Sequence, residues 1–309
     1  MFWEITINIL SAYAFIIKQI LILFKHNYKI LLVFLAIILV IYLYFYFDKS
    51  EETGKRKFLN KIPFISIIQD FFNYNYKNKE TMDKIFKDKD NSAIITSYPH
   101  GIFPVTSFLA YSSGDFDITD LHEAVFPILF KLPIVRDIAL AFGFVSSKKS
   151  TLEHLLQKNK KIFITPGGSR EINYSNRYYL DLNLKNEGFI KLAWEQKSIL
   201  IPTFSEGENR IFQQIKIPTI QNFFYRLIRY HFPTIFFGPY STNLTLHIGN
   251  PLNPTDFVSY NEFKNSYYKT LFTLIYDNEK GPIKGELLEK MTEMGFEINN
   301  TEREKYVLI

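Results

Sequence analysis

The sequence contains no cysteine among its 309 residues. This absence excludes disulfide bonds, zinc sites built from thiolates and a cysteine nucleophile. The sequence also lacks a Gly-x-Ser-x-Gly elbow, a His-Glu-x-x-His pair, a P-loop and a dinucleotide-binding glycine pattern. His122-Glu123 has no second histidine at the spacing of a zinc-binding helix. The sequence therefore has none of these motifs of hydrolases, metalloproteases, kinases or dehydrogenases.

The net charge of the sequence is +5, and its basic residues are scattered rather than gathered in one stripe. A nucleic-acid-binding protein more often gathers Lys and Arg on one face, so nucleic acid is not an expected partner. Scattered positive charge suits an anionic lipid surface or the phosphates of a nucleotide-like cofactor. Aromatic residues are abundant, with 31 Phe and 20 Tyr. Such abundance is typical of a protein that works at a membrane, but an AT-rich genome would produce the same composition.

Two apolar segments near the N-terminus are candidate membrane helices. Residues 30–47 are 18 consecutive apolar or aromatic residues, which reaches the length needed to span the hydrocarbon core. Residues 5–24 carry polar side chains on one helical face, so this segment either spans as the first arm of a hairpin or lies in the interface. We expect the transmembrane hairpin, because residues 25–29 form a short polar turn. The basic residues after it predict a cytosolic location for the rest of the chain.

The remaining sequence alternates predicted strands and helices. Isoleucine-rich runs predict short buried strands at residues 92–97, 161–165, 198–204 and 243–248. Helical patterns are found at residues 151–158, 188–196 and 260–276. This alternation predicts an α/β fold with a mainly parallel sheet flanked by helices. We expect a membrane anchor and linker at residues 1–61 and one catalytic domain at residues 62–309.

Three of the predicted strands end in polar loops that contain glycine. The first strand continues into Tyr98-Pro99-His100-Gly101, the second into residues 166–171, and the third into residues 205–209. The carboxyl ends of parallel strands lie at one edge of the sheet, where active sites form. We therefore expect one cleft that contains a histidine, a Gly-Gly turn and several carboxylates.

These loops resemble the motifs of the type-2 diacylglycerol acyltransferase family, which includes monoacylglycerol and wax-alcohol acyltransferases. Residues 98–101 are similar to its His-Pro-His-Gly motif, and residues 167–171 to its Gly-Gly-x-x-Glu motif. Residues 186–193, together with 201–202 and 207–209, resemble its longest signature. The N-terminal hairpin matches as well, so the resemblance covers nearly the whole chain.

The sequence departs from the family pattern at several positions, which leaves the acceptor specificity open. Tyr98 stands where the family often has His, Asn186 where it often has Arg, and Glu206 where Phe is usual. Residues 238–240 replace a more basic glycine turn.

The resemblance implies a glycerolipid acyltransferase-like fold, long-chain acyl-CoA as the donor, no permanently bound cofactor and no metal. It also implies catalysis at the cytosolic face of the endoplasmic reticulum membrane, with lipid droplets as a further location. The expected partners are acyl-CoA, diacylglycerol or a related lipid alcohol, and the lipid bilayer. A homo-oligomer is left open.

Acyl transfer to an alcohol requires a base for the hydroxyl proton and donors for the thioester oxyanion. We expect His100 to be the general base, with a capping or core histidine as the alternative. The wider glycerolipid acyltransferase pattern has an aspartate five residues after the histidine, but this chain has Val105 there. Glu171 is therefore the candidate that orients the imidazole. Its alternative role is that of a carboxylate at a helix N-terminus.

The glycines and nearby basic residues are candidates for binding the acyl-CoA. The backbone at Gly101, Gly167 and Gly168 would supply oxyanion donors or a phosphate cradle, with a plain tight turn as the alternative. Lys148, Lys149 and Arg170 would pair with coenzyme A phosphates, and a solvated basic surface is the alternative for the lysines. The remaining motif residues, expected on the acceptor side or in structural positions, are Tyr98, Pro99, Gly188, Phe189, Glu208 and Asn209.

These observations predict an O-acyltransferase that moves a fatty acyl group from coenzyme A to diacylglycerol and forms triacylglycerol. The aromatic stretch at residues 223–237 either rests on the membrane and admits the lipid acceptor or forms a core helix. The alternative functions are a monoacylglycerol, wax-alcohol or lysophospholipid acyltransferase. A non-catalytic lipid-binding membrane protein with the same fold is the alternative from another class.

Overall fold

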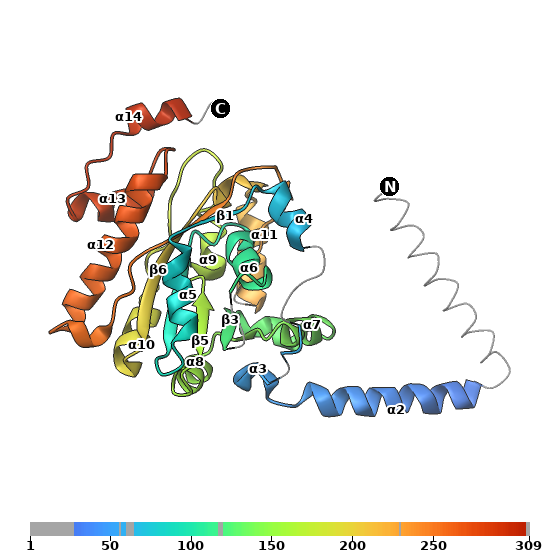
Figure 1. The fold of residues 1–309 in the computed structure, drawn as a ribbon. Coiled ribbons are helices and arrows are strands. Elements are labelled where there is room, and N and C mark those ends of the chain that lie inside the picture. Colours follow the sequence, from blue (N-terminus) through green and yellow to red (C-terminus); the bar gives the residue numbers. More distant parts are fainter. Residues whose placement is uncertain (1–27, 56, 60–64, 117–119, 229, 307–309) are drawn as a thin grey trace. The chain divides into compact units, whose positions relative to one another are not determined.

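The computed structural model describes residues 28–55, 57–59, 65–116, 120–228 and 230–306. The chain divides into two compact units, residues 1–49 and residues 50–309. Helix α2 (Tyr28–Tyr46) belongs to the first unit, and the described strands all belong to the second (Figure 1).

Helix α2 covers all but the last residue of the span predicted at 30–47. Large apolar side chains along it are exposed, including those of Val40 and Tyr44. Within the described ranges, no helix has the combination of length and hydropathy that crossing a membrane requires. The predicted transmembrane hairpin is thus not found there, and its first arm, residues 5–24, lies outside the described residues.

The described part of the second unit is built around a seven-stranded sheet with the order β1-β9-β6-β2-β5-β3-β4. Its strands are β1 (Asn75–Lys77), β2 (Ala93–Tyr98), β3 (Leu121–Val125), β4 (Val145–Ser146), β5 (Lys161–Ile164), β6 (Ile199–Glu206) and β9 (Thr245–Ile248). Neighbouring strands run parallel except for the pair β6 and β9. The prediction of an α/β fold with a mainly parallel sheet is confirmed, and the four predicted strands are β2, β5, β6 and β9.

Helices cover both faces of the sheet (Figure 1). Ile94 and Leu200 point into a core with α8, α10, α12 and α13, whereas Ala93, Ile95 and Ile201 point into a core with α5 and α6. This alternation along β2 and β6 is the period of two expected of strands buried on both faces. The helices are α3 (Ser50–Thr53), α4 (Ile65–Phe71), α5 (Lys79–Lys87), α6 (Val105–Ser112), α7 (Val135–Ala141), α8 (Lys149–Leu156), α9 (Gly168–Glu171), α10 (Gly188–Gln196), α11 (Pro218–Ile228), α12 (Tyr260–Asn278), α13 (Gly285–Glu293) and α14 (Asn300–Arg303).

Residues 50–55 and 57–59, which lie in the predicted linker, belong to the second unit and pack against its other residues. The N–H groups of Phe58 and Leu59 donate to the carbonyl oxygen of Ala141 at 3.1 and 3.0 Å. Arg136 is almost fully buried and forms an ion pair with Glu51 at 2.9 Å. The predicted boundary after residue 61 stays a prediction.

Hydroxyl pairs join the central strands β2 and β6 at both ends. The Oγ atoms of Ser92 and Ser198 lie 2.7 Å apart at the amino ends, and those of Ser97 and Ser205 lie 2.7 Å apart near the carboxyl ends. All four serines are buried. The pairing leaves these hydroxyls satisfied inside the sheet.

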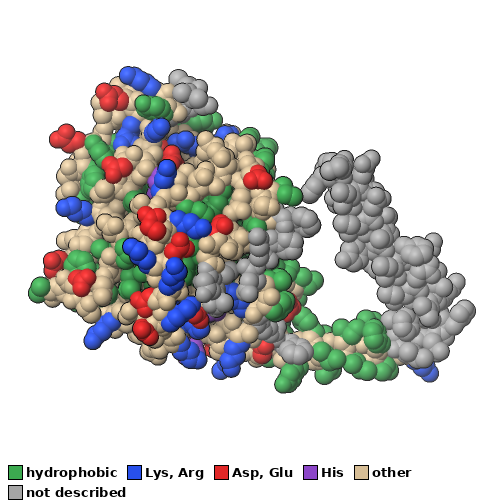
Figure 2. Space-filling model, in the orientation of Figure 1, with side chains coloured by type: hydrophobic (Ala, Val, Ile, Leu, Met, Phe, Trp, Pro, Cys, Tyr) green, Lys and Arg blue, Asp and Glu red, His purple; other side chains and the backbone are tan. Residues whose placement is uncertain are grey.

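A small antiparallel hairpin, β7 (Gln213–Ile215) and β8 (Ile235–Phe237), carries α11 between its strands. Its apolar side chains are exposed on α11 and β8. On the face of the molecule in Figure 2, acidic and basic side chains are interspersed and form no stripe of one sign. Mixed charge of this kind agrees with the scattered basic residues of the sequence.

Candidate active site

The strand β2 leads directly into the histidine loop, residues 99–104, which ends where α6 begins. Gly101 in this loop has a φ of +64°, a conformation that glycine adopts without steric cost. A Cβ atom at Gly101 would lie 3.2 Å from Cγ of Glu208. The loop therefore needs glycine here both for its conformation and for its close packing.

The imidazole of His100 is buried and is held by the main chain of its own loop. Its Nδ1 lies 3.0 Å from the carbonyl oxygen of Gly101. Because that oxygen can only accept, the neutral ring carries its proton on Nδ1 and leaves the lone pair on Nε2. Burial lowers the pKa of His100 below its usual value. The ring is therefore neutral near pH 7, with Nε2 as its basic nitrogen.

Glu171 lies on α9, after the glycine turn that follows β5, and is fully buried. Its Oε2 accepts a hydrogen bond from the main-chain N–H of His100 at 2.7 Å, and its Oε1 accepts from the N–H of Asn183 at 3.1 Å. Burial raises the pKa of Glu171 to about 8, while both N–H donors oppose the rise. The carboxylate thus joins the histidine loop to the segment that precedes α10.

Glu171 contacts the main chain of His100 rather than its imidazole, so its predicted role in orienting the ring stays a prediction. In the described part of the chain, both carboxylate oxygens bind main-chain N–H groups, and Nδ1 of His100 meets Gly101 instead. The two residues are neighbours, as expected, and Glu171 binds the main chain of the loop. A catalytic role for Glu171 stays a prediction.

The two glycines of the Gly-Gly turn differ in what their positions require. A Cβ atom at Gly167 would lie 2.0 Å from Oε2 of Glu171, so the carboxylate can approach only because Gly167 has no side chain. Gly168 has a φ of +54°, and no described atom would lie within 4 Å of its Cβ. The N–H of Gly168 donates to the carbonyl oxygen of Thr165 at 3.0 Å. The N–H of Gly168, which was expected to bind an oxyanion, is therefore already used in a hydrogen bond within the turn.

Glu208 braces the histidine loop from the other side. It follows β6 and is buried, and its oxygens accept from the N–H groups of Val105 and Thr106, both at 2.8 Å. A carboxylate at a helix N-terminus satisfies free N–H groups and interacts favourably with the helix dipole. Burial raises the pKa of Glu208 to about 7, and its hydrogen bonds oppose the rise. The start of α6, and with it the end of the histidine loop, is fixed by this side chain.

The expected coenzyme A lysines lie at a distance from this loop. Lys148 and Lys149 are exposed where β4 leads into α8. Lys149 forms an ion pair with Glu195 at 3.1 Å. In the sheet order, β4 is three positions from β2, which corresponds to roughly 14 Å at the usual strand spacing. Their role in binding coenzyme A stays a prediction.

The remaining predicted residues occupy different environments. Tyr98 and Phe189 are buried in the core with α10 and α12. Gly188 begins α10, and both Gly188 and Arg170 are exposed. Asn209 is buried, and neither polar atom of its side chain has a hydrogen-bond partner among the described residues.

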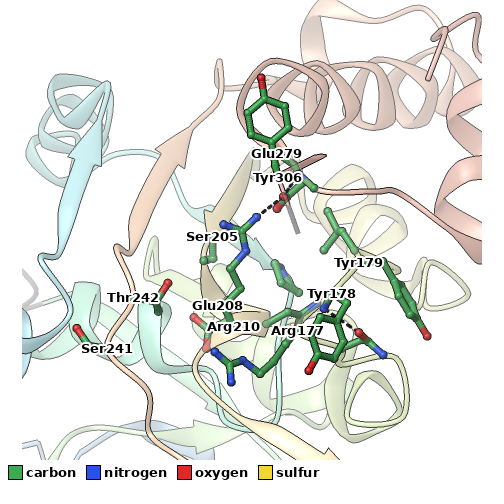
Figure 3. A pocket seen from close by; sticks show the side chains of 16 residues that line it. Arg177, Tyr178, Tyr179, Ser205, Glu208, Arg210, Ser241, Thr242, Glu279 and Tyr306 are labelled. Carbon is green, nitrogen blue, oxygen red and sulfur yellow. Dashed lines mark hydrogen bonds and ion pairs between the residues drawn. The ribbon is translucent and has the colours of Figure 1, made fainter. Parts of the chain in front are cut away.

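A cavity of about 470 Å³ opens at the carboxyl ends of β2 and β6 (Figure 3). It is lined by the predicted residues Pro99, Glu208 and Asn209. Arg177 and Arg210, which no sequence motif marks, line it as well. Neither arginine belongs to a glycine loop, so no local pattern marked it. No group of three or more potential metal ligands is present in the described ranges.

Comparison with known proteins places the chain in a family. Residues 22–255, well over half of the sequence, match the family model described as diacylglycerol acyltransferase. The chain therefore belongs to the diacylglycerol acyltransferase family, and the resemblance of its motifs to that family is confirmed.

Individual relatives include diacylglycerol O-acyltransferase 2A of Umbelopsis ramanniana, which is 29% identical over 181 residues, or 55% of this chain and 50% of the relative. The human 2-acylglycerol O-acyltransferase 1 is 24% identical over 289 residues, 83% of each chain. The matches to the first relatives span about half the length of those proteins. A solved structure of the 1-acyl-sn-glycerophosphate acyltransferase PlsC from Thermotoga maritima aligns with 68% of this chain and 79% of its own, with 15% identity and a TM-score of 0.41.

Proposed function

We propose that this chain is an acyl-CoA-dependent O-acyltransferase that transfers a fatty acyl group to diacylglycerol and forms triacylglycerol. The observation that carries the proposal is the histidine loop. It presents a buried imidazole, neutral near pH 7, between two buried carboxylates that bind its main chain and the start of α6. Membership in the diacylglycerol acyltransferase family supports the choice of reaction.

In the proposed reaction, Nε2 of His100 accepts the proton of the acceptor hydroxyl while the hydroxyl oxygen attacks the carbonyl carbon of the thioester. The carbonyl becomes a tetrahedral oxyanion, which collapses and expels the thiolate of coenzyme A. The thiolate then takes the proton from Nε2, so the imidazole returns to its neutral form. Holding the ring through Nδ1 keeps Nε2 aimed and unprotonated for each cycle.

Monoacylglycerol is the second candidate acceptor. The alignment with the human 2-acylglycerol O-acyltransferase 1 extends over 83% of this chain, further than the alignments with the relatives named diacylglycerol O-acyltransferase. The chemistry at His100 would be the same for both acceptors, and the difference would lie in the acceptor pocket.

The test uses membranes from a host that makes no triacylglycerol and expresses this chain. Labelled oleoyl-CoA is supplied with diacylglycerol, monoacylglycerol, a fatty alcohol or a lysophospholipid, and the products are separated. Label in triacylglycerol is the expected result. Label in another product would replace the acceptor, and well-folded protein that labels nothing would overturn the proposed activity in favour of lipid binding without catalysis.

The pH dependence of the reaction follows from the burial of His100. Only the neutral imidazole can accept the hydroxyl proton, and its pKa lies below the usual 6.5. We therefore expect the protonation of His100 to lower kcat/KM only below pH 6.5. A change centred between pH 7 and 8 would instead report Glu208 and Glu171, whose pKa values are about 7 and about 8. A decline above pH 6.5 that persists when both glutamates are replaced with glutamine would contradict this assignment of the base.

We also propose that the enzyme works at the cytosolic face of the endoplasmic reticulum and on lipid droplets, with α11 and β8 against the lipid. Phe223 and Leu227 on α11 are 61% and 66% exposed. Phe236 on β8 lies 5.4 Å from the ring of Phe103, which belongs to the histidine loop. Contiguous exposed apolar surface of this kind is typical of contacts with membranes. An acceptor lipid could pass along it toward the loop.

A double replacement, Phe223→Ser with Leu227→Ser, tests this surface. Both side chains are largely exposed, so folding should change little, whereas each loses about 1.5–3 kcal/mol of burial in lipid. We expect the apparent KM for diacylglycerol in vesicles to rise by about tenfold or more, with less change in the KM for oleoyl-CoA. The control is Val258→Ser, at an apolar side chain that is 96% exposed elsewhere on the unit. Equal KM values for the double variant and the control would contradict the proposal that the acceptor lipid contacts α11.

A further inference from the structure

The cavity beside the histidine loop is polar, and its lining includes two arginines and two glutamates. Two guanidinium groups, those of Arg177 and Arg210, project into it (Figure 3). Arg210 forms an ion pair with Glu279 at 2.7 Å, so these two charges offset each other. The carboxylate of Glu208, which also lines the cavity, is bound to the N-terminus of α6. Both carboxylates of the lining are thus engaged elsewhere, and the guanidinium group of Arg177 has neither of them as an ion-pair partner.

Arg177 is held in place without losing its hydrogen-bond donors. Its guanidinium carbon lies 4.0 Å from the centre of the Tyr240 ring, a stacked arrangement that leaves the edge of the guanidinium group available. Among the described residues, Arg177 forms no ion pair with a carboxylate. A fixed planar cation in a cavity is suited to bind phosphate oxygens in a bidentate manner.

Asn209 is the second sign that the cavity is built for a ligand. Its side chain is 93% buried, and both Nδ2 and Oδ1 lack partners in the described part of the chain. Leaving a buried amide unsatisfied destabilises the free protein. A bound molecule with acceptor and donor groups would satisfy both atoms.

We infer that this cavity binds the phosphate-bearing part of coenzyme A, with Arg177 as the main contact for phosphate and Asn209 as a hydrogen-bonding partner. The inference rests on the proposed function, in which acyl-CoA is the donor. Pro99 lines the cavity and is the neighbour of His100 in the chain. A donor anchored there by its phosphates could extend its thioester to the histidine loop.

The experiment measures binding by calorimetry on the full-length chain purified in detergent. The ligands are free coenzyme A, pantetheine, which lacks the phosphates, and inorganic pyrophosphate. We expect coenzyme A to bind at least tenfold more tightly than pantetheine, because a charge-assisted bidentate contact is among the stronger hydrogen bonds. Arg177→Gln should weaken the binding of coenzyme A and pyrophosphate by about 10- to 100-fold and leave pantetheine unchanged. Arg177→Lys should recover part of the loss.

Two further variants distinguish a binding role from a structural one. Asn209→Leu should raise the Tm of the ligand-free protein, because it removes the unsatisfied amide, and should weaken coenzyme A binding. Lys84→Gln, at an exposed lysine of α5 that does not line the cavity, is the matched control and should bind coenzyme A normally. Normal binding by Arg177→Gln, or an equal loss in Lys84→Gln, would overturn the inference.

The outcome also separates this inference from the proposed function. If the wild-type chain forms triacylglycerol while Arg177→Gln binds coenzyme A normally, the cavity is excluded as the phosphate site and the activity stands. If coenzyme A binds through Arg177 but no acyl product forms with any acceptor, the phosphate site stands and the activity is excluded. If the wild-type chain binds neither coenzyme A nor pyrophosphate, the inference is wrong.

Discussion

Replacing His100 with alanine is expected to reduce the formation of triacylglycerol by about 10²- to 10⁴-fold, the usual contribution of a general base. In the structure, Nδ1 of the ring donates to Gly101 and leaves Nε2 as the basic nitrogen. Without the imidazole, the acceptor hydroxyl must lose its proton to water, which is a far weaker base. The loss should appear in kcat, because the binding contacts of donor and acceptor remain.

The control for this substitution is His154→Ala, which removes a half-buried histidine from α8. It should leave the rate within about twofold of wild type, since α8 leads from His154 into the amino end of β5, at the edge of the sheet opposite to His100. Both variants are compared at matched protein levels in the membrane assay with labelled oleoyl-CoA. Triacylglycerol formation that persists in His100→Ala would assign the base to another group.

Replacing Gly167 with alanine is expected to have the second largest effect. The added Cβ would lie 2.0 Å from Oε2 of Glu171, an oxygen that also accepts the N–H of His100 at 2.7 Å. Because Glu171 is fully buried, relief of the overlap must shift the carboxylate or the turn. We expect a loss of about 1–3 kcal/mol in the free energy of unfolding. Displacement of the histidine loop should lower the rate by about 10²-fold.

Gly168→Ala is the matched control, one residue along the same turn. It too adds one methyl group, but no described atom would lie within 4 Å of it, so its cost is the left-handed backbone at a φ of +54°. That cost is about 1–2 kcal/mol of stability, and the rate should change little. Denaturant unfolding in detergent and the acyl transfer assay give the two quantities. Equal loss of activity in both variants would show that the contact of Gly167 with Glu171 is not what matters.

The strands that consist mainly of apolar residues could be predicted from the sequence. The strands that are short, or that carry charged residues in their interior, could not. β2, β5 and β6 contain two Ile each and β9 contains one, and all four lie within two residues of their predicted starts and ends. β3 (Leu121–Val125) was missed because it contains His122-Glu123, and a buried glutamate in a strand interior is unusual. The antiparallel direction of β9 against β6 depends on how the intervening chain returns, which local sequence does not encode.

The candidate site was predicted as a set of neighbours but not as a set of contacts. Because the glycine loops follow parallel strands, His100, Glu171 and Glu208 were predicted to lie at one edge of the sheet. The structure places them there. Which atoms meet depends on main-chain directions within the turns, and both carboxylates bind N–H groups rather than the imidazole. Asn183 was missed because a single asparagine in a loop has no pattern that marks it.

The two serine pairs between β2 and β6 fix the register of these strands, and thereby the position of the loop that carries His100. A slip of one strand by a single residue would turn its side chains to the opposite face and part the hydroxyls at both ends together. The register of β2 against β6 is therefore fixed, and with it the distance of His100 from the amino edge of the sheet. Ser92 and Ser198, at the amino edge of the sheet, help to determine where along the opposite edge His100 lies.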